Sequence, residues 1–373
     1  MAATAAAIFS IYCFGCASGE ASGGFSGCAT SRGEAFNFYA MNTAIYAEAT
    51  DKPFNQNEGE NIRKLFLSLE KEFSASEKDS FINRFNEAKA GEKTAVSDTG
   101  KVLFNLCEKA CALTEGRFNP AVLPLSELWG FYPDFPKEDF TPPQSSEIEK
   151  ILNSGEINYE NVRFLDGDGT VYKENSATKI ELGGILKGYA ADEAGKILLD
   201  AGHTSGYVNA GGSSLFILGA KTLGVRHPRK TGENLLSFNI ENRKNFSVST
   251  SGDYERFYEY GGERYCHVID VKSGRPIETG VMQVTIIGGE NEFSGALADA
   301  FSTALMTESF SESLSAGSEN ALLTLAEKLL KAEGFEKAVF FIAAESNKEN
   351  VLFTNAEEKS FTLKDESYRT VYF

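Results

Sequence analysis

Glycine-rich motifs stand in a fixed order between residues 180 and 303, and they constrain the fold more than any other feature of the chain. The motifs are IELGGILKGYAAD at 180–192, VNAGG at 208–212, TSGDY at 250–254 with CHVID at 266–270, and ADAFST at 298–303. Glycine lets the backbone approach a ligand closely, and the charged and hydroxyl residues beside these glycines can hold phosphate or a divalent cation. The motifs therefore predict a pocket for a phosphate-bearing ligand and a cation.

The composition is that of a globular protein and argues against several functions. Of the 373 residues, 42% are hydrophobic, with 29 Phe and 14 Tyr, so the chain can bury a large core. No apolar run reaches about 18 residues, the length that spans a bilayer. The net charge of -17 argues against nucleic-acid binding, because an acidic surface repels phosphate backbones. Any phosphate must therefore bind in a locally prepared pocket.

A bound metal is expected to be magnesium rather than zinc, because the three histidines are too scattered for a zinc cluster. Asp299 precedes Ser302 by three residues and Thr303 by four, so their oxygens share one face of a helix. Magnesium takes one or two carboxylates from the protein and completes its shell with phosphate, hydroxyl and water oxygens. The alternative for this trio is an ordinary helix start with two small polar residues.

The order of the expected elements favours an α+β fold with mixed or antiparallel sheets flanked by helices. Apolar residues at helical spacing predict helices over 61–72, 101–114, 145–153, 184–201 and 296–306. Strands are expected over 36–48, 207–210, 214–218, 223–226, 236–240, 246–249 and 282–288, with hairpins over 162–172 and 339–354. We expect residue 145 or 146 to cap the helix that starts there.

Lys187 and His267 are the residues of these motifs whose chemistry suits a reaction on phosphate. Lys187 falls in the first turn of the helix expected over 184–201, where free N–H groups and the helix dipole attract anions. His267 is expected on a strand between the TSGDY turn and the metal helix, and a near-neutral pKa suits proton transfer. Taken alone, each has a simpler interpretation, as a solvated lysine and a structural histidine.

Residues 1–34 resemble the leader and tether of a bacterial lipoprotein. The apolar stretch 2–15 leads into CFGC at 13–16, where Cys16 matches the lipidated position. Residues 17–33 are rich in Gly, Ser and Ala, a composition typical of a flexible tether. We expect Cys16 to anchor the protein in the cell envelope, on the outer face of the cytoplasmic membrane; the alternative is a disordered peptide.

Together with SGRP at 273–276, the ordered motifs resemble those of the ApbE family of FAD:protein FMN transferases. The likeness runs from about residue 36 to the carboxyl terminus and includes MNT at 41–43, SFINRFN at 80–86, FNP at 118–120 and LWGF at 128–131. It implies a single elaborated ApbE-like domain over 35–373, related to the T-fold. It also implies magnesium-dependent transfer of the FMN half of FAD to a Thr or Ser hydroxyl of a flavoprotein, with release of AMP.

The resemblance also assigns roles to residues of this chain. His267 would take the proton of the acceptor hydroxyl, and magnesium would bind Asp299, Ser302, Thr303 and the Gly184 carbonyl. FAD would contact Met41, Ser76, Arg117, Phe118, Asn119, Glu181, Lys187, Asn209, Gly211, Gly212, Thr250, Ser251, Gly252 and Ile269. The partner is expected to be a flavoprotein subunit with a Ser/Thr-Gly-Ala-Thr-like acceptor motif.

The chain departs from the usual pattern of the family at several positions. Glu181 stands in place of Asp and keeps the charge, whereas Asn119 stands in place of Asp and loses it. Ser76 lies near a position where the family has an aromatic side chain. The other departures are Asn42 for Gly, Ser213 for Asp and Cys266 for Ser. We expect these changes to affect FAD affinity more than the class of reaction.

Three alternatives use the same motifs. The chain could bind FAD without transferring it, or hydrolyse FAD to FMN and AMP with water in place of the acceptor hydroxyl. The presence of His267, Asp299 and Thr303 speaks against binding alone. The chain could also be its own acceptor, because SGCATS at 26–31 loosely resembles the acceptor motif, but Cys28 interrupts it and favours the tether interpretation.

Overall fold

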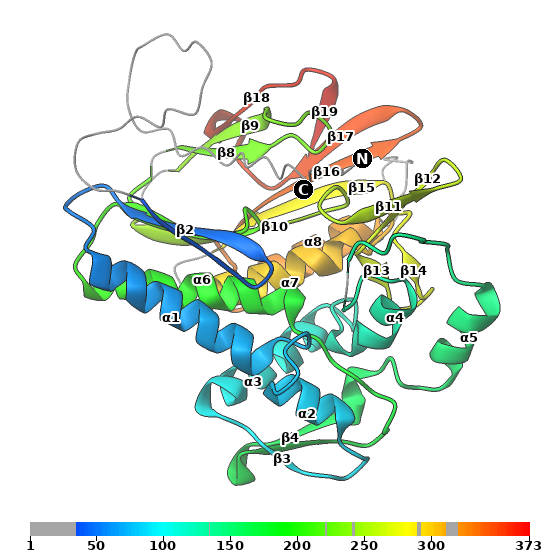
Figure 1. Cartoon of the computed structure of the whole chain (residues 1–373). Coiled ribbons are helices and arrows are strands. Elements are labelled where there is room, and N and C mark those ends of the chain that lie inside the picture. The colour runs from blue at the N-terminus through cyan, green and yellow to red at the C-terminus, as the bar shows by residue number, and fades with distance from the viewer. Residues whose placement is uncertain (1–34, 134, 221, 241–242, 289–291, 311–319) are drawn as a thin grey trace.

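A nine-stranded sheet organises the part of the chain that the computed structural model describes, residues 35–373 without 134, 221, 241–242, 289–291 and 311–319 (Figure 1). Across the sheet the strands are β1 Phe36–Ala40, β2 Thr43–Ala49, β6 Gly206–Ala210, β7 Ser214–Leu218, β10 Asn245–Gly252, β15 Val281–Ile287, β16 Val339–Ser346, β17 Glu349–Thr354 and β19 Tyr368–Tyr372. Neighbours are antiparallel except β17 and β19, which are parallel.

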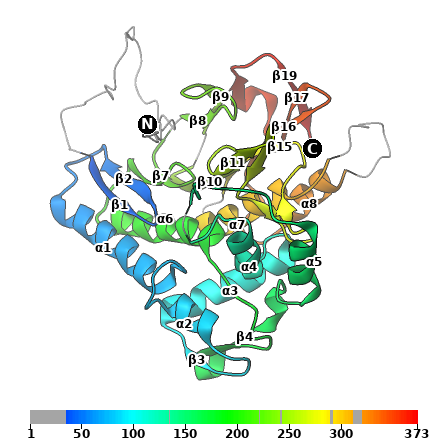
Figure 2. The ribbon, with the colours of Figure 1, turned by 45° about the vertical axis from the view of Figure 1, so that its right-hand side comes forward.

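The two faces of this sheet are covered by different layers. Helices α6 Gly183–Asp200 and α7 Ser294–Met306 lie along one face (Figure 2). A three-stranded sheet of β8 Thr222–Arg226, β9 Asn234–Asn239 and β18 Phe361–Leu363 covers the other. Alternate residues of a strand point to opposite faces, so Phe216 and Leu218 join the core under the helices while Leu215 and Ile217 join the core between the sheets.

A further helical region packs beside α6 and α7. It contains α1 Gln56–Phe73, α2 Phe81–Glu87, α3 Asp98–Leu113 and α8 Ala321–Leu330, with a small sheet of β3 Thr94–Ala95, β4 Val162–Leu165 and β5 Thr170–Lys173. The capping box of Asn55 and Glu58 starts α1, and the Ser97 side chain caps α3. Gly116, with φ of 74°, follows the end of α3, where glycine suits the left-handed backbone.

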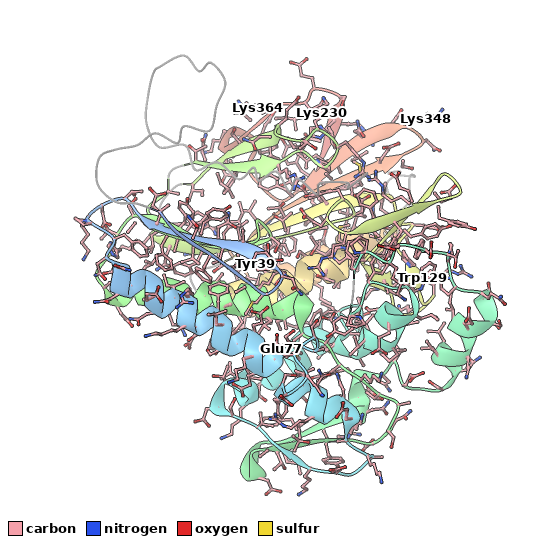
Figure 3. The ribbon with its side chains drawn as sticks, viewed as in Figure 1. Tyr39, Glu77, Trp129, Lys230, Lys348 and Lys364 are labelled. Carbon is pink, nitrogen blue, oxygen red and sulfur yellow. The ribbon has the colours of Figure 1, made fainter. Side chains whose placement is uncertain are left out.

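A third region packs beside α7 and holds the aromatic residues of the LWGF motif. It consists of α4 Leu123–Leu128, α5 Ser145–Asn153, the hairpin of β11 Phe257–Tyr260 and β12 Glu263–Cys266, and the short pair β13 Ile269–Asp270 and β14 Arg275–Pro276. The buried Trp129 indole donates to the Gly274 carbonyl over 2.8 Å, which ties α4 to this hairpin region (Figure 3).

The α+β fold class is confirmed, and the expected helices and most strands lie where the sequence places them. The single strand expected over 36–48 is wrong, because Met41 and Asn42 have φ of 53° and 58° and turn the chain into a hairpin. The hairpin 339–354 forms, but β19 follows it and adds a parallel strand. Gln144 is the N-cap of α5, not residue 145 or 146.

The leader and tether expected over residues 1–34, with Cys16, lie outside the described residues. Within the residues that are described, no helix is long and apolar enough to cross a membrane. The single domain expected over 35–373 stays a prediction.

Candidate functional site

A buried polar network fixes the segment that leads into α6. The side chain of Asn86 donates to the Ile180 carbonyl over 2.9 Å and accepts from the Ile180 N–H over 2.8 Å. Lys173, which is fully buried, donates to the carbonyls of Asn86 and Thr178 over 2.7 and 2.9 Å. These bonds set the position of the next residue, Glu181, and of the start of α6.

The Glu181 carboxylate occupies the amino terminus of α6. It accepts from the Gly183 N–H over 2.6 Å. A carboxylate of the protein therefore occupies the helix terminus at which the sequence predicts a bound ligand anion. Burial raises the pKa of Glu181, while the Gly183 N–H and the charges of Lys187 and Arg256 oppose this shift. Lys187 begins the second turn of α6 rather than lying in its first, and its amine donates to the Gly183 carbonyl over 2.6 Å.

Asp299 lies in the middle of α7 and faces α6. Its side chain is buried, and its Oδ2 accepts from the Gly188 N–H over 3.1 Å. Burial raises the pKa of Asp299, and the positive charge of Lys187 opposes the rise. Lys187 therefore acts on both carboxylates, Glu181 and Asp299.

Hydroxyl groups gather one turn after Asp299. Ser302 Oγ and Thr303 Oγ1 lie 2.8 and 3.2 Å from the Ser251 Oγ at the end of β10. Both hydroxyls also donate to the Asp299 carbonyl, over 2.9 and 3.1 Å. A Cβ built on Gly184 would lie 3.5 Å from Thr303 Oγ1, which places the start of α6 directly against this cluster.

The chemistry of this donor set fits magnesium. Among the described residues no group of three or more His, Cys, Asp or Glu could hold a metal. A single buried carboxylate beside hydroxyl and carbonyl oxygens instead suits a hard cation that takes its remaining ligands from water and substrate phosphate. Asp299, Ser302, Thr303 and the Gly184 carbonyl would hold the ion.

His267 lies just after β12, between strands rather than on the strand that the sequence predicts. Its Nδ1 is 3.3 Å from the Arg256 carbonyl, which can only accept, so this contact places the proton on Nδ1 and leaves Nε2 free as a base. Burial and the positive charges of Arg256 and Lys187 lower the pKa of His267 to about 4. The imidazole is therefore neutral at physiological pH.

Comparison with known proteins agrees with this geometry. The ApbE family matches residues 41–322. The chain belongs to the ApbE family. The family resemblance expected from the motifs is thus confirmed.

Individual relatives and structures show the same likeness. An FAD:protein FMN transferase of Rhodobacter capsulatus is 32% identical over 60% of this chain but only 41% of its own length. One of Treponema pallidum is 30% identical over 65% of this chain and 69% of that protein. The ApbE protein of Thermotoga maritima aligns with a TM-score of 0.70 and 30% identity, covering 83% of this chain and 94% of that one. The flavin transferase ApbE of Vibrio cholerae has a TM-score of 0.71 at 22% identity, over 88% and 99%.

The glycine turn of the second ApbE motif joins β6 to β7. Asn209 accepts from the Gly212 N–H over 2.7 Å, and Gly211 and Gly212 have φ of 69° and 74°. Glycine adopts these positive φ angles without steric strain, which explains why both positions of the turn are glycine. Thr250 and Gly252 lie near the end of β10, on either side of the serine that contacts α7.

Met41 and Ser76, the expected flavin contacts from the first third of the chain, lie around the end of α1. The Met41 N–H donates to a Glu70 carboxylate oxygen over 2.8 Å. Ser76 is exposed in the loop after α1, and its N–H donates to the Ser74 hydroxyl over 3.2 Å. The roles of both residues toward FAD stay predictions.

The remaining expected flavin contacts have structural partners of their own. Phe118 packs against Gly184, with a ring carbon 3.3 Å from the position of a Cβ there. Arg117 forms an ion pair with Glu308, and the Asn119 side chain accepts from the N–H two residues later. Ile269 is buried in the apolar cluster of the third region. The structure thus brings Phe118 close to Gly184, whereas the other three have partners elsewhere.

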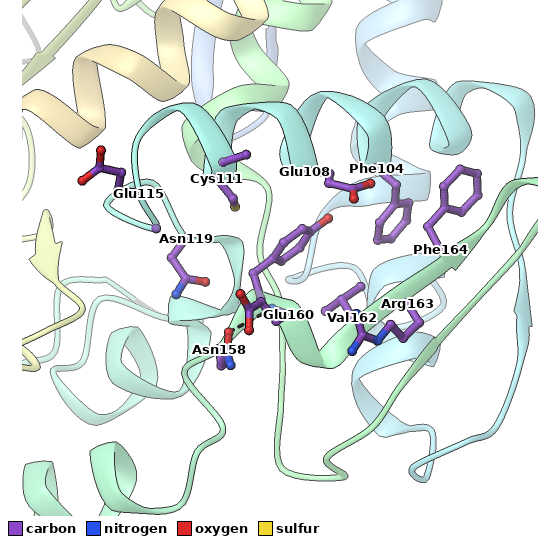
Figure 4. A pocket seen from close by; sticks show the side chains of 13 residues that line it. Phe104, Glu108, Cys111, Glu115, Asn119, Asn158, Glu160, Val162, Arg163 and Phe164 are labelled. Carbon is purple, nitrogen blue, oxygen red and sulfur yellow. Dashed lines mark hydrogen bonds between the residues drawn. The ribbon is translucent and has the colours of Figure 1, made fainter. Parts of the chain in front are cut away.

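Asn119 also lines a cavity of about 640 Å³ between α3 and β4 (Figure 4). Phe104, Glu108 and Cys111 of α3 form one wall, and residues 158–160 and 162–164 form the other. Lys187, Asp299 and His267 are absent from its lining. This cavity is therefore separate from the cluster built on α6 and α7.

Arg256 is a residue of the ApbE site that the sequence motifs did not single out. Its charge acts on both Glu181 and His267, and its carbonyl holds the imidazole. It stands two residues after the TSGDY motif, in a stretch with no distinctive spacing. The signal that could have found it is its position between the TSGDY and CHVID motifs, which the fold brings to one site.

Proposed function

We propose that this protein is a magnesium-dependent FAD:protein FMN transferase. The reaction forms a phosphoester between the FMN phosphorus and a Thr or Ser hydroxyl of an acceptor flavoprotein, and AMP leaves as the pyrophosphate bond breaks. The observation that carries the proposal is the set of contacts around Lys187: its amine and the Glu181 carboxylate both bond to Gly183, and the N–H of the next residue, Gly188, donates to the Asp299 carboxylate. A cation suited to phosphate and a carboxylate suited to metal thus lie at the start of α6, and the effect of the Lys187 charge on His267 supports a base in the same site, the set that phosphoryl transfer requires.

The residues of the chain have distinct roles in this proposal. The Nε2 atom of His267 accepts the proton of the acceptor hydroxyl as its oxygen attacks the FMN phosphorus. Lys187 binds the pyrophosphate, whose negative charge also raises the basicity of His267 by offsetting the lysine charge. Magnesium, held by Asp299 and its neighbouring hydroxyls, would neutralise charge on the phosphoryl oxygens.

We further propose that the acceptor carries a Ser/Thr-Gly-Ala-Thr-like segment, and that Cys16 is lipidated and holds the protein at the cell envelope. The second of these proposals rests on the sequence of residues 1–34. Membrane fractionation of cells that express the whole chain tests it. Wild type should sediment with membranes and Cys16→Ala should not; equal sedimentation of both would refute a lipid anchor at this residue.

The transferase proposal is tested by mixing the protein with FAD, Mg²⁺ and a flavoprotein fragment that carries the acceptor segment. Intact mass should show a gain of one FMN unit on the fragment, and in-gel fluorescence should survive denaturation. EDTA and His267→Ala should each abolish the gain, whereas Asp200→Asn, an exposed change at the end of α6, should not. A control without the fragment separates the alternatives: rapid AMP release there would indicate an FAD pyrophosphatase, and binding of FAD with no product in either case would indicate a binding protein.

A further inference from the structure

Asp192 is a buried carboxylate in the third turn of α6 that none of the roles above uses. It is 4% exposed. One of its oxygens accepts from the N–H groups of Gly295 and Ala296 over 2.9 and 3.0 Å, and the other accepts from Gly295 over 3.1 Å. The Ser247 hydroxyl on β10 donates to it over 2.6 Å. All these partners belong to the protein, and two of them are the N–H groups of the second and third residues of α7.

The residue before α7 supplies no side-chain cap. Its N-cap residue, Phe293, has φ of 61° and makes no side-chain capping bond. The first N–H groups of a helix need acceptors from outside the helix, and a carboxylate there also gains from the helix dipole. Asp192 therefore caps α7 from the neighbouring helix, across 104 residues of sequence.

Glycine allows the two helices to approach closely at the same place. A Cβ on Gly188 would lie 2.2 Å from the Gly295 carbonyl oxygen, and a Cβ on Gly295 would lie 2.5 Å from the Asp192 carboxylate. One turn further along α7, the Gly188 N–H reaches the Asp299 carboxylate. Two hydrogen-bonded ties thus join α6 to α7, the first at Asp192 and the second at Asp299.

We propose that Asp192 is a positioning residue for the metal and pyrophosphate site. By holding the start of α7 against α6, it fixes Asp299 and the two hydroxyls of α7 relative to Gly184 and Lys187 on α6. Ser247 in turn holds the Asp192 carboxylate in its orientation. The inference rests on the proposed function, because it concerns the cation and phosphate that this function uses.

The variant that tests this role is Asp192→Asn, which keeps the shape and one acceptor oxygen but loses the charge and the second acceptor. Binding of Mn²⁺ in the presence of FAD, followed by electron paramagnetic resonance, should weaken by about 10–100-fold, the usual effect of losing a partner that orients metal ligands. The Mg²⁺ concentration for half-maximal FMN transfer should rise by a similar factor, while kcat at saturating Mg²⁺ stays near that of wild type. Asp200→Asn, the same change at an exposed position of α6, is the matched control and should alter neither.

A second measurement needs neither metal nor FAD. Amide hydrogen exchange over residues 294–299 should be faster in Asp192→Asn than in wild type, because the start of α7 has lost its cap. Ser247→Ala removes a single hydrogen bond and is the variant to use if Asp192→Asn does not fold. It should weaken Mn²⁺ binding as well, but by a smaller factor. Unchanged Mn²⁺ binding in both variants, or a loss of stability with an unchanged Mg²⁺ requirement, would overturn the proposal.

Failure of the Asp192 proposal can be distinguished from failure of the transferase proposal. If wild type binds Mn²⁺ with FAD but transfers no FMN, the transferase proposal fails while the Mn²⁺ shift still reports on Asp192. If wild type transfers FMN and the variants match it in Mn²⁺ binding and Mg²⁺ requirement, only the role of Asp192 is refuted.

Discussion

Asp299 is buried as an acid whose charge the protein alone does not fully compensate. Burial raises its pKa, and the Gly188 N–H and the Lys187 charge offset this only in part. A carboxylate with a raised pKa costs stability at neutral pH, because the folded state favours the protonated form. A cation bound at Asp299 would recover this cost, which is the behaviour expected of a metal ligand.

Asp299→Asn should therefore separate activity from stability. We expect FMN transfer to fall by about 100-fold or more, since loss of a metal ligand removes several kcal/mol of transition-state stabilisation. The thermal unfolding midpoint in EDTA should stay the same or rise, because the change removes an unfavourable buried charge. A fall in that midpoint, or full activity, would contradict the assignment of Asp299 as a ligand.

His267 sets the pH dependence of the reaction. Its pKa in the folded protein is lowered to about 4, so the base is unprotonated throughout the neutral range and is lost only as the pH falls toward that value. The acid limb of kcat/KM, which reports the free enzyme, should therefore lie well below the ordinary histidine pKa of about 6.5. Measurement of kcat/KM between about pH 4 and pH 8 checks this.

The variant Arg256→Gln tests whether His267 controls this pH profile. It removes one of the two positive charges that lower the pKa of His267 but keeps the backbone carbonyl that holds Nδ1. The acid limb should move to higher pH. A limb near about 6.5 in wild type would show that the pKa of His267 is not lowered, and no movement in Arg256→Gln would show that another group controls the profile.

At the scale of elements, α2 and the β4–β5 hairpin support the start of α6. The Asn86 side chain pairs with both backbone groups of Ile180, as a neighbouring strand would. The buried Lys173 amine donates to the Asn86 carbonyl. The last residue of the SFINRFN stretch, Asn86, thus has a structural role in holding the segment before α6.

Asn86→Ala should destabilise the protein by about 1–3 kcal/mol for each buried backbone group of Ile180 that it leaves unpaired. Urea denaturation measures this loss. The KM for FAD should also rise, because Glu181 follows the released residue directly. Asn83→Ala, the same change in the same helix at a half-buried position, should cost less; an equal loss would mean that the bonds to Ile180 contribute little.

At the scale of the whole molecule, the nine-stranded sheet begins at Phe36, directly after the tether expected over residues 17–33. If residues 1–34 only anchor the protein, a chain that starts at residue 35 should keep the unfolding midpoint and the FMN transfer rate of the full chain. Thermal unfolding and the mass assay with the acceptor fragment compare the two. A lower midpoint for the shorter chain would place part of the folded domain before residue 35.

Much of the fold follows from local patterns. The helices expected over 101–114 and 184–201 form because their apolar residues recur at the helical period, and this period depends only on neighbours in the sequence. The hydroxyls of Ser302 and Thr303 reach the Asp299 carbonyl for the same reason, since residues three and four further along a helix lie one turn away. The order of the glycine motifs identified the family because each motif keeps its own local chemistry.

Contacts between distant segments were decided by the tertiary structure. Local pattern did not reveal that Asp192 caps α7 or that Asn86 pairs with Ile180. Such contacts depend on how helices and sheets pack, and a side chain carries no local sign of a partner a hundred residues away. The sequence by itself therefore determined the elements, the family and the groups that carry the chemistry. Packing decided which side chains bond to distant backbone groups and so fix the positions of those elements.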